Sequence, residues 1–100
     1  MSTRAAAVAG TFYERDGGRL RQQVQLLLEA ARQRACPAPK ALIGPHAGYI
    51  YSGATAAEAY RQLLPVAGQI RRVVLLGPAH RVYLEGVAIP SANSFTTPLG

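Results

Sequence analysis

Two short segments with the same pattern decide the expected fold, LIGPH at residues 42–46 and LLGPAH at residues 75–80. In each segment an apolar run is followed by Gly-Pro and then by a histidine. Continuous apolar runs of this length are typical of strands that are covered on both faces in a parallel sheet. We therefore predict strands over residues 41–44 and 73–76. Each Gly-Pro step marks where the chain leaves the sheet.

The sequence predicts one helix before the first apolar run and another between the two runs. Apolar residues recur at helical spacing from about residue 17 to residue 34, Asp16 can cap the start, and Pro37 prevents continuation. A second helix is expected from about residue 53 to residue 64, with Ser52 as its cap. Its expected buried stripe consists of Ala56, Ala57, Tyr60, Leu63 and Leu64.

This order of elements predicts an α/β fold. Two apolar runs joined by one helix indicate a βαβ unit of a mostly parallel sheet flanked by helices, with a right-handed connection. A further strand is expected at residues 86–90, and residues 95–100 resemble a strand that enters a turn. Two or three strands and two helices cannot close a two-sided sheet. We therefore expect residues 1–100 to be the N-terminal portion of a single, larger domain, cut short at its end.

Composition and charge narrow the setting. The longest apolar runs fall far short of the roughly 18 residues that span a bilayer, so no membrane association is expected. The single cysteine, Cys36, excludes an internal disulfide, and the N-terminus lacks a secretory apolar segment, so a cytoplasmic protein is expected. The formal charge of +6 would permit nucleic-acid binding. The arginines are not interleaved with stacking aromatics, however, so a solvated basic surface is the preferred interpretation.

The candidate chemistry lies in the two histidines of the chain, His46 and His80. Parallel strands end at the same sheet edge, so both imidazoles should emerge in one region, where open α/β sheets bind ligands. Histidine is the commonest metal ligand and the usual acid–base group near neutral pH, so both roles are open on this pattern. The equivalent placement of the pair favours a shared functional site over two incidental histidines.

The loop around His46 adds further candidates. Tyr49 and Tyr51 carry phenols that could donate a proton or orient a bound substrate, although ordinary packing explains either one equally well. Ser52 is expected to cap a helix rather than act as a nucleophile. Cys36 lies in the connector at the opposite end of the strand and is interpreted as an incidental free thiol. Two histidines do not complete a metal site, so a further ligand must lie beyond residue 100 or in a second copy of the chain.

Several motifs in this order resemble the Memo family, whose prokaryotic members are also called AmmeMemoRadiSam system protein B. They are AGTFY at residues 9–13, PHAGYIYSG at 45–53 with the alanines and tyrosine of 56–60, LGPAH at 76–80 and FTTPLG at 95–100. The resemblance runs from about residue 4 to the end, and PHAGYIYSG is its most specific part.

The resemblance implies a fold similar to class III extradiol dioxygenases, which are non-haem iron enzymes. It also implies that His46 and His80 are metal ligands, completed by a later cysteine that this sequence lacks and that Cys36 does not match. Bacterial and archaeal members are associated with a radical-SAM protein, which is an expected partner. The expected metal is iron or copper, with zinc as the alternative.

Three hypotheses of function follow. The first is a metal-dependent oxidoreductase, similar to the dioxygenases, in which Tyr49 or Tyr51 positions a small-molecule substrate. The second is a non-enzymatic role, either metal handling or a scaffold that binds a protein partner, with a homo-oligomer as one way to complete the site. The third is nucleic-acid binding, which is the least favoured.

Overall fold

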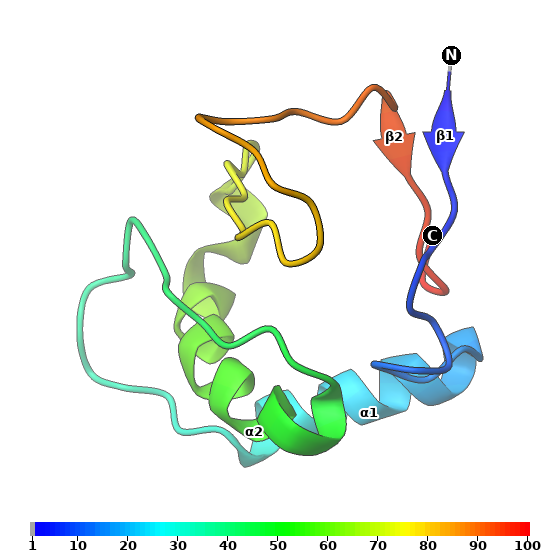
Figure 1. Ribbon diagram of the computed structural model, residues 1–100. Helices are drawn as coiled ribbons and strands as arrows, with labels where there is room; N and C mark the ends of the chain where they lie inside the picture. The colour runs from blue at the N-terminus through cyan, green and yellow to red at the C-terminus, as the bar shows by residue number, and fades with distance from the viewer. Residues whose placement is uncertain (1) are drawn as a thin grey trace.

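The computed structural model describes residues 2–100 and has an α/β composition (Figure 1). Helices α1 and α2 pack against each other, and a two-stranded parallel sheet lies beside them. Long connections without regular structure run between these elements. The elements in chain order are β1 Thr3–Arg4, α1 Gly17–Ala30, α2 Tyr49–Tyr60, the 3₁₀-helix η1 Arg61–Gln69 and β2 Ser94–Phe95. Within residues 2–100, no helix is both long and apolar enough to cross a membrane.

Helix α1 begins as predicted and ends earlier than predicted. The Asp16 side chain accepts a hydrogen bond of 2.9 Å from the Arg19 amide, which confirms Asp16 as the N-cap. The helix ends at Ala30 rather than near residue 34, because Ala31 has an extended backbone. Beyond it, the amides of Arg32 and Arg34 bond to side chains that project from α2 and η1. Tertiary bonds thus replace the last helical turn.

Helix α2 starts four residues before the predicted start. It begins at Tyr49 with Gly48 as its N-cap, so Ser52 lies inside the helix and the prediction that it caps the helix is wrong. The Gly48 carbonyl already accepts bonds from the Tyr51 and Ser52 amides, and the Ser52 hydroxyl donates to the Ala47 carbonyl at 2.9 Å. Ser52 therefore binds the preceding loop to the first turn of the helix and does not act as its N-cap.

The helical segment after α2 tightens instead of stopping at Leu64. From Arg61 to Gln69 it continues as a 3₁₀-helix that contains Pro65. Proline lacks the amide that would bond to the carbonyl four residues earlier, and its ring crowds that carbonyl. In this chain that carbonyl belongs to Arg61, the first residue after α2, which explains why regular α-helix ends at Tyr60.

The core is small and lies where α1 crosses α2. Leu20, Ala31 and Ala57 are its buried apolar residues. Gly53 brings the helices close, since a Cβ there would lie 3.0 Å from the Leu27 side chain. Of the stripe predicted for the second helix, Ala57 is buried and Ala56 is half-buried, whereas Tyr60 is exposed. Its last two residues fall in η1, where Leu63 is half-buried and Leu64 is exposed. Tyr60 and Leu64 were wrongly expected in the core, because the contact with α1 covers only a narrow strip of this helical segment.

Gln62 joins the end of α1 to α2 by hydrogen bonds. Its side chain is 8% exposed and its amide nitrogen donates to the Arg32 carbonyl at 2.8 Å and to the Glu58 carbonyl at 3.0 Å. Its amide oxygen accepts from the Arg34 amide and from the Gln33 side chain. A buried polar group is favourable only when its hydrogen bonds are made, and here both ends of the amide are satisfied.

The sheet joins the two ends of the described chain. Strands β1 and β2 run parallel, with Thr3 opposite Ser94 and Arg4 opposite Phe95 (Figure 1). The hydroxyls of Thr3 and Ser94 lie 2.9 Å apart, and the Thr96 amide bonds to the Arg4 carbonyl. This confirms the predicted strand and turn near residue 95 but places its partner at the N-terminus.

The three other predicted strands do not form. Residues 41–44, 73–76 and 86–90 have no ladder hydrogen bonds, so the predicted βαβ unit is wrong for this structure. Apart from half-buried Leu42, these residues are exposed to solvent, with Ile43 fully exposed and Leu75 83% exposed. Strand structure requires a neighbouring backbone, and the described residues place none beside these segments. The apolar residues of these three segments favour burial, but the described part of the chain leaves most of them exposed.

We predict that Gly17→Ala destabilises the chain. A Cβ at this position would lie 2.5 Å from the Pro98 carbonyl oxygen, which belongs to the backbone and cannot simply rotate away. Overpacking of this kind costs about 1–3 kcal/mol, measured as the free energy of unfolding in denaturant. Gly68→Ala in η1 is the matched control, because a Cβ there meets nothing within 4 Å. Equal stability of the two variants would contradict the contact between α1 and the C-terminal turn.

Candidate metal centre

The structure brings His46 and His80 together although the strands that were expected to carry them are absent. Their ring centroids lie 5.1 Å apart with an angle of 37° between the ring planes. Both side chains are exposed. The pairing of the two histidines was inferred from strands that share a sheet edge. Here the two rings lie side by side on segments without regular secondary structure rather than on a hydrogen-bonded sheet.

The backbone next to His46 is held by the start of α2. Ala47 follows His46 directly, and its carbonyl accepts the bond from Ser52, whose side chain is only 8% exposed. The next residue, Gly48, accepts amides of the first helical turn. Two successive carbonyls after His46 are therefore fixed by a helix, which limits how far this histidine can move.

The N-terminal segment supports the same helix start from the other side. The Phe12 carbonyl accepts a hydrogen bond of 2.7 Å from the Tyr49 amide. The ring of Tyr13 lies 5.7 Å from the ring of Tyr49, with the planes at 41°. The AGTFY motif at residues 9–13 was noted only for its resemblance to the Memo family, and its contact with Tyr49 was not predicted. An aromatic pair directly after a Gly-Thr turn was the available signal.

The two candidate tyrosines of the loop differ in their surroundings. Tyr51 is 85% exposed, whereas Tyr49 is half-buried. Burial raises the pKa of the Tyr49 phenol above its ordinary value of 10.0, and the neighbouring phenols of Tyr13 and Tyr60 raise it further. Tyr49 therefore keeps its proton at neutral pH and can act as a hydrogen-bond donor. The positioning roles suggested for Tyr49 and Tyr51 remain predictions.

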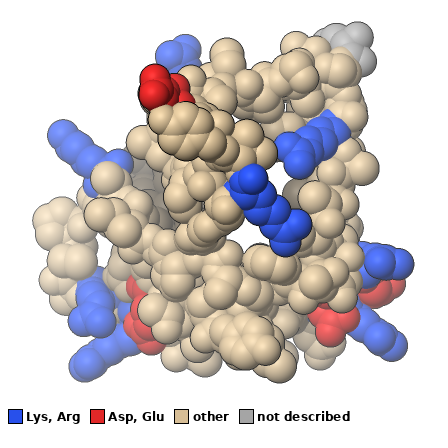
Figure 2. Space-filling model, viewed as in Figure 1, with Lys and Arg blue, Asp and Glu red and all other residues tan. Residues whose placement is uncertain are grey.

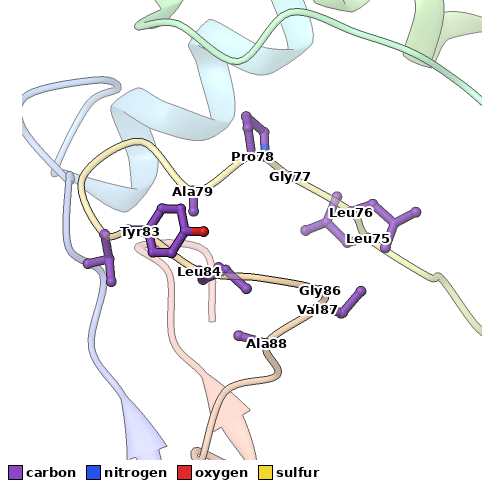
Figure 3. A pocket seen from close by; sticks show the side chains of 11 residues that line it. Leu75, Leu76, Gly77, Pro78, Ala79, Tyr83, Leu84, Gly86, Val87 and Ala88 are labelled. Atoms are coloured by element: carbon purple, nitrogen blue, oxygen red, sulfur yellow. The ribbon is translucent and has the colours of Figure 1, made fainter.

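An open hollow of about 630 Å³ is lined by residues on both sides of His80 in the sequence. The chain runs from Leu75 past Pro78 and returns through Leu84 to Ala88 around it (Figure 3). Its lining is mostly aliphatic, with the phenol of Tyr83 as a polar group. The Tyr83 hydroxyl donates to the Glu85 carboxylate at 2.8 Å. The volume falls in the usual range for small-molecule sites, but the walls are open to solvent.

The spacing of the histidine rings fits two ligands of one metal ion. A histidine nitrogen binds zinc-like ions at about 2.0–2.1 Å, so two such ligands in tetrahedral geometry place their ring centres about 5 Å apart. The 5.1 Å separation of the two ring centres agrees with this value. Among residues 2–100 no group of three or more His, Cys, Asp or Glu side chains that could hold a metal ion occurs. Cys36 is an exposed free thiol.

Basic side chains are spread over the face in Figure 2 rather than gathered in one patch. On the face in Figure 2, lysine and arginine side chains lie mainly at the rim, with acidic side chains between some of them. A nucleic-acid surface would require a continuous basic stripe. This face offers none.

The fold and the histidine pair define an α/β chain with two imidazoles at one candidate metal centre, and sequence comparison places it in a family. The Memo-like protein family matches residues 4–100, and the chain belongs to this family. Protein MEMO1 of Danio rerio is 44% identical over 99% of the chain, and the Protein memo-1 homolog of Caenorhabditis elegans is 44% identical over 98%. The MEMO1 family protein of Aquifex aeolicus (strain VF5) is 41% identical over 100% of the chain.

The relatives are longer than this chain. The matched region covers 32% of the Danio rerio protein, 27% of the Caenorhabditis elegans protein and 36% of the Aquifex aeolicus protein. The chain thus spans about a third of the length of the curated relatives that it matches.

We predict that Ser52→Ala loosens the loop that carries His46. The variant removes the donor to the Ala47 carbonyl at a buried position, which should lower the free energy of unfolding by about 1 kcal/mol. The ring resonances of His46 should shift and broaden in NMR spectra. Thr55→Ala, an exposed hydroxyl on the same helix, should change stability by less than about 0.5 kcal/mol. Unchanged His46 resonances in Ser52→Ala would contradict the tie.

We predict a loss of stability at alkaline pH that depends on Tyr49. Its pKa is raised in the folded state, so the folded chain holds this proton more tightly than the unfolded chain does. The resulting stability is complete below pH 10.0 and declines as the pH rises through the raised pKa. Denaturant titrations across this range should show that Tyr49→Phe removes this component of the decline. A Tyr49→Phe variant that keeps the wild-type profile would contradict the contribution of this phenol.

Proposed function

We propose that this Memo-like chain supplies two ligands, His46 and His80, of a metal centre that serves redox chemistry on a small molecule. The observation that carries the proposal is the spacing of 5.1 Å between the two ring centres. That spacing suits one shared ion. Iron or copper is the metal that we favour, with zinc as the alternative.

The donor set supports a centre that is open to further ligands. Two imidazole nitrogens leave two or more positions free, and a third protein ligand is expected from the longer form of the family or from a second copy of this chain. When bound, a redox-active ion would supply a site for oxygen and for a phenolic or thiol substrate. The residues of this chain would hold the ion and shape the space beside it.

Within this proposal each nearby residue has a separate task. Tyr49, protonated at neutral pH, donates a hydrogen bond toward a bound anionic or carbonyl oxygen. Tyr51, largely exposed, contacts substrate as it enters. The hollow lined by residues on both sides of His80 receives the apolar part of a small substrate.

A second function is favoured by the exposure of the same histidines. Both ligands and the walls of the hollow are open to solvent, and enzymes usually exclude water from such centres. The alternative is therefore non-enzymatic, a metal-handling protein or a scaffold that works beside a radical-SAM protein. We propose a cytoplasmic setting for either role, because Cys36 is a free, exposed thiol.

We predict that the isolated chain binds a divalent metal weakly and through its histidines. Loss of groups that merely orient metal ligands costs about 10–100-fold in affinity, so His46→Ala or His80→Ala should weaken binding by at least about 100-fold. Titration with cobalt(II), followed by its visible absorption, measures this. Cys36→Ser is the control and should bind like the wild type.

Several results would count against this assignment. Binding that survives both histidine changes, or that disappears in Cys36→Ser, would refute the histidine pair. Tight, stoichiometric binding by this chain would reveal a third ligand within it. In the longer relatives, the metal-loaded protein should be screened with catechol and thiol substrates. Turnover that is lost in the histidine variants, with the fold intact, supports the enzyme, whereas partner capture that survives both changes supports the scaffold.

A further inference from the structure

The turn that precedes α1 is held together by its own hydrogen bonds. Gly10 adopts a positive φ of 85°, which favours glycine at this position. The Gly10 amide donates to the Tyr13 carbonyl at 2.7 Å, and the amides of Thr11 and Phe12 both donate to the Val8 carbonyl. These bonds fix the direction in which Tyr13 leaves the turn.

This turn contacts the first residue of α2 in two ways. The amides of the first helical turn have no partner inside the helix, and the Tyr49 amide finds its partner in the Phe12 carbonyl. The Tyr13 ring lies against the Tyr49 ring at 5.7 Å with a tilt of 41°, a favourable arrangement for an aromatic pair. Both the backbone and the side chain of Tyr49 are therefore held from outside the helix.

Tyr49 is three residues from His46, and the residues between them are also held. The Ala47 carbonyl is bonded to Ser52 and the Gly48 carbonyl to the first helical turn. Because Ala47 and Gly48 are both held by hydrogen bonds, the position of Tyr49 restricts the position of His46. The opposite histidine, His80, is exposed and lies at a bend that follows a segment without regular structure. His46 is therefore the member of the pair that the folded chain holds in place.

We propose that Tyr13 is a positioning residue for the candidate metal centre, which fixes Tyr49 through its ring and thereby sets the place of His46. The proposal rests on the metal function put forward above. Tyr13 acts through Tyr49 and touches neither ion nor substrate. Because the contact joins two rings, the aromatic ring of Tyr13 is the part that matters and its hydroxyl is dispensable.

The test compares Tyr13→Leu with Tyr13→Phe in the full chain. Tyr13→Leu keeps an apolar side chain but removes the ring, whereas Tyr13→Phe keeps the ring. Cobalt(II) affinity should fall about 10-fold in Tyr13→Leu, as it does on loss of groups that orient metal ligands, and stay within about 2-fold of wild type in Tyr13→Phe. Phe95→Leu in β2 is the control, an aromatic away from the centre, and should bind like the wild type.

Two further readings separate positioning from a general loss of structure. Hydrogen exchange at the Tyr49 amide should accelerate in Tyr13→Leu, and the His46 ring resonances should shift in the metal-free chain. Circular dichroism should show that α1 and α2 persist in every variant compared. A purely structural role would lower the melting temperature of Tyr13→Leu and leave metal affinity and His46 resonances unchanged, which would overturn the proposal.

The outcomes also distinguish this proposal from the metal function on which it rests. A wild-type chain that binds no cobalt(II) overturns the metal function, and the His46 resonances then decide about positioning. Unchanged resonances in Tyr13→Leu overturn positioning in that case too. Tyr13→Phe that is as weak as Tyr13→Leu overturns the role of the ring and assigns the effect to the hydroxyl. Rescue by Tyr13→Phe together with a shifted His46 in Tyr13→Leu supports it.

Discussion

The packing of α1 against α2, closed by the Gln62 amide, is the constraint on which the rest of the structure depends. The buried apolar residues are few, and they belong to α1, its C-cap and α2. Gln62 binds the backbone at Arg32 and Arg34, so the chain leaves α1 along a fixed path. Because both ends of the amide are paired, its burial favours one arrangement of the helices over others. A core this small leaves little stability to spare.

The candidate metal centre depends on this helix pair through the start of α2. His46 stands just before a helix whose first amide and first ring are held by the N-terminal turn, and whose Ser52 holds the intervening backbone. His80 has no comparable support among the described residues, since it follows an exposed segment without regular structure. One histidine of the pair is thus held by the helical part of the chain, and the other is not.

Features that depend on neighbouring residues were predicted well from the sequence, whereas features that depend on contacts between distant segments were mostly not. Asp16 as a cap and the family motifs depend on neighbouring residues, and both are confirmed. The strands predicted at residues 41–44 and 73–76 do not form. An apolar run indicates residues that favour burial, but it does not show which backbone segment would hydrogen-bond to them. The histidine pair was nevertheless expected side by side, and the rings lie 5.1 Å apart. Its metal role remains a proposal.

The pairing of β1 with β2 has a consequence for the order of folding. Thr3 and Ser94 are 91 residues apart, and closing a flexible loop of that length costs about 4 kcal/mol in chain entropy. The exposed hydrogen bonds between these short strands contribute about 1 kcal/mol each, which barely offsets that cost. Formation of the helix pair first shortens the chain that remains to be closed. The two ends should therefore meet late in folding and separate first when the protein begins to open.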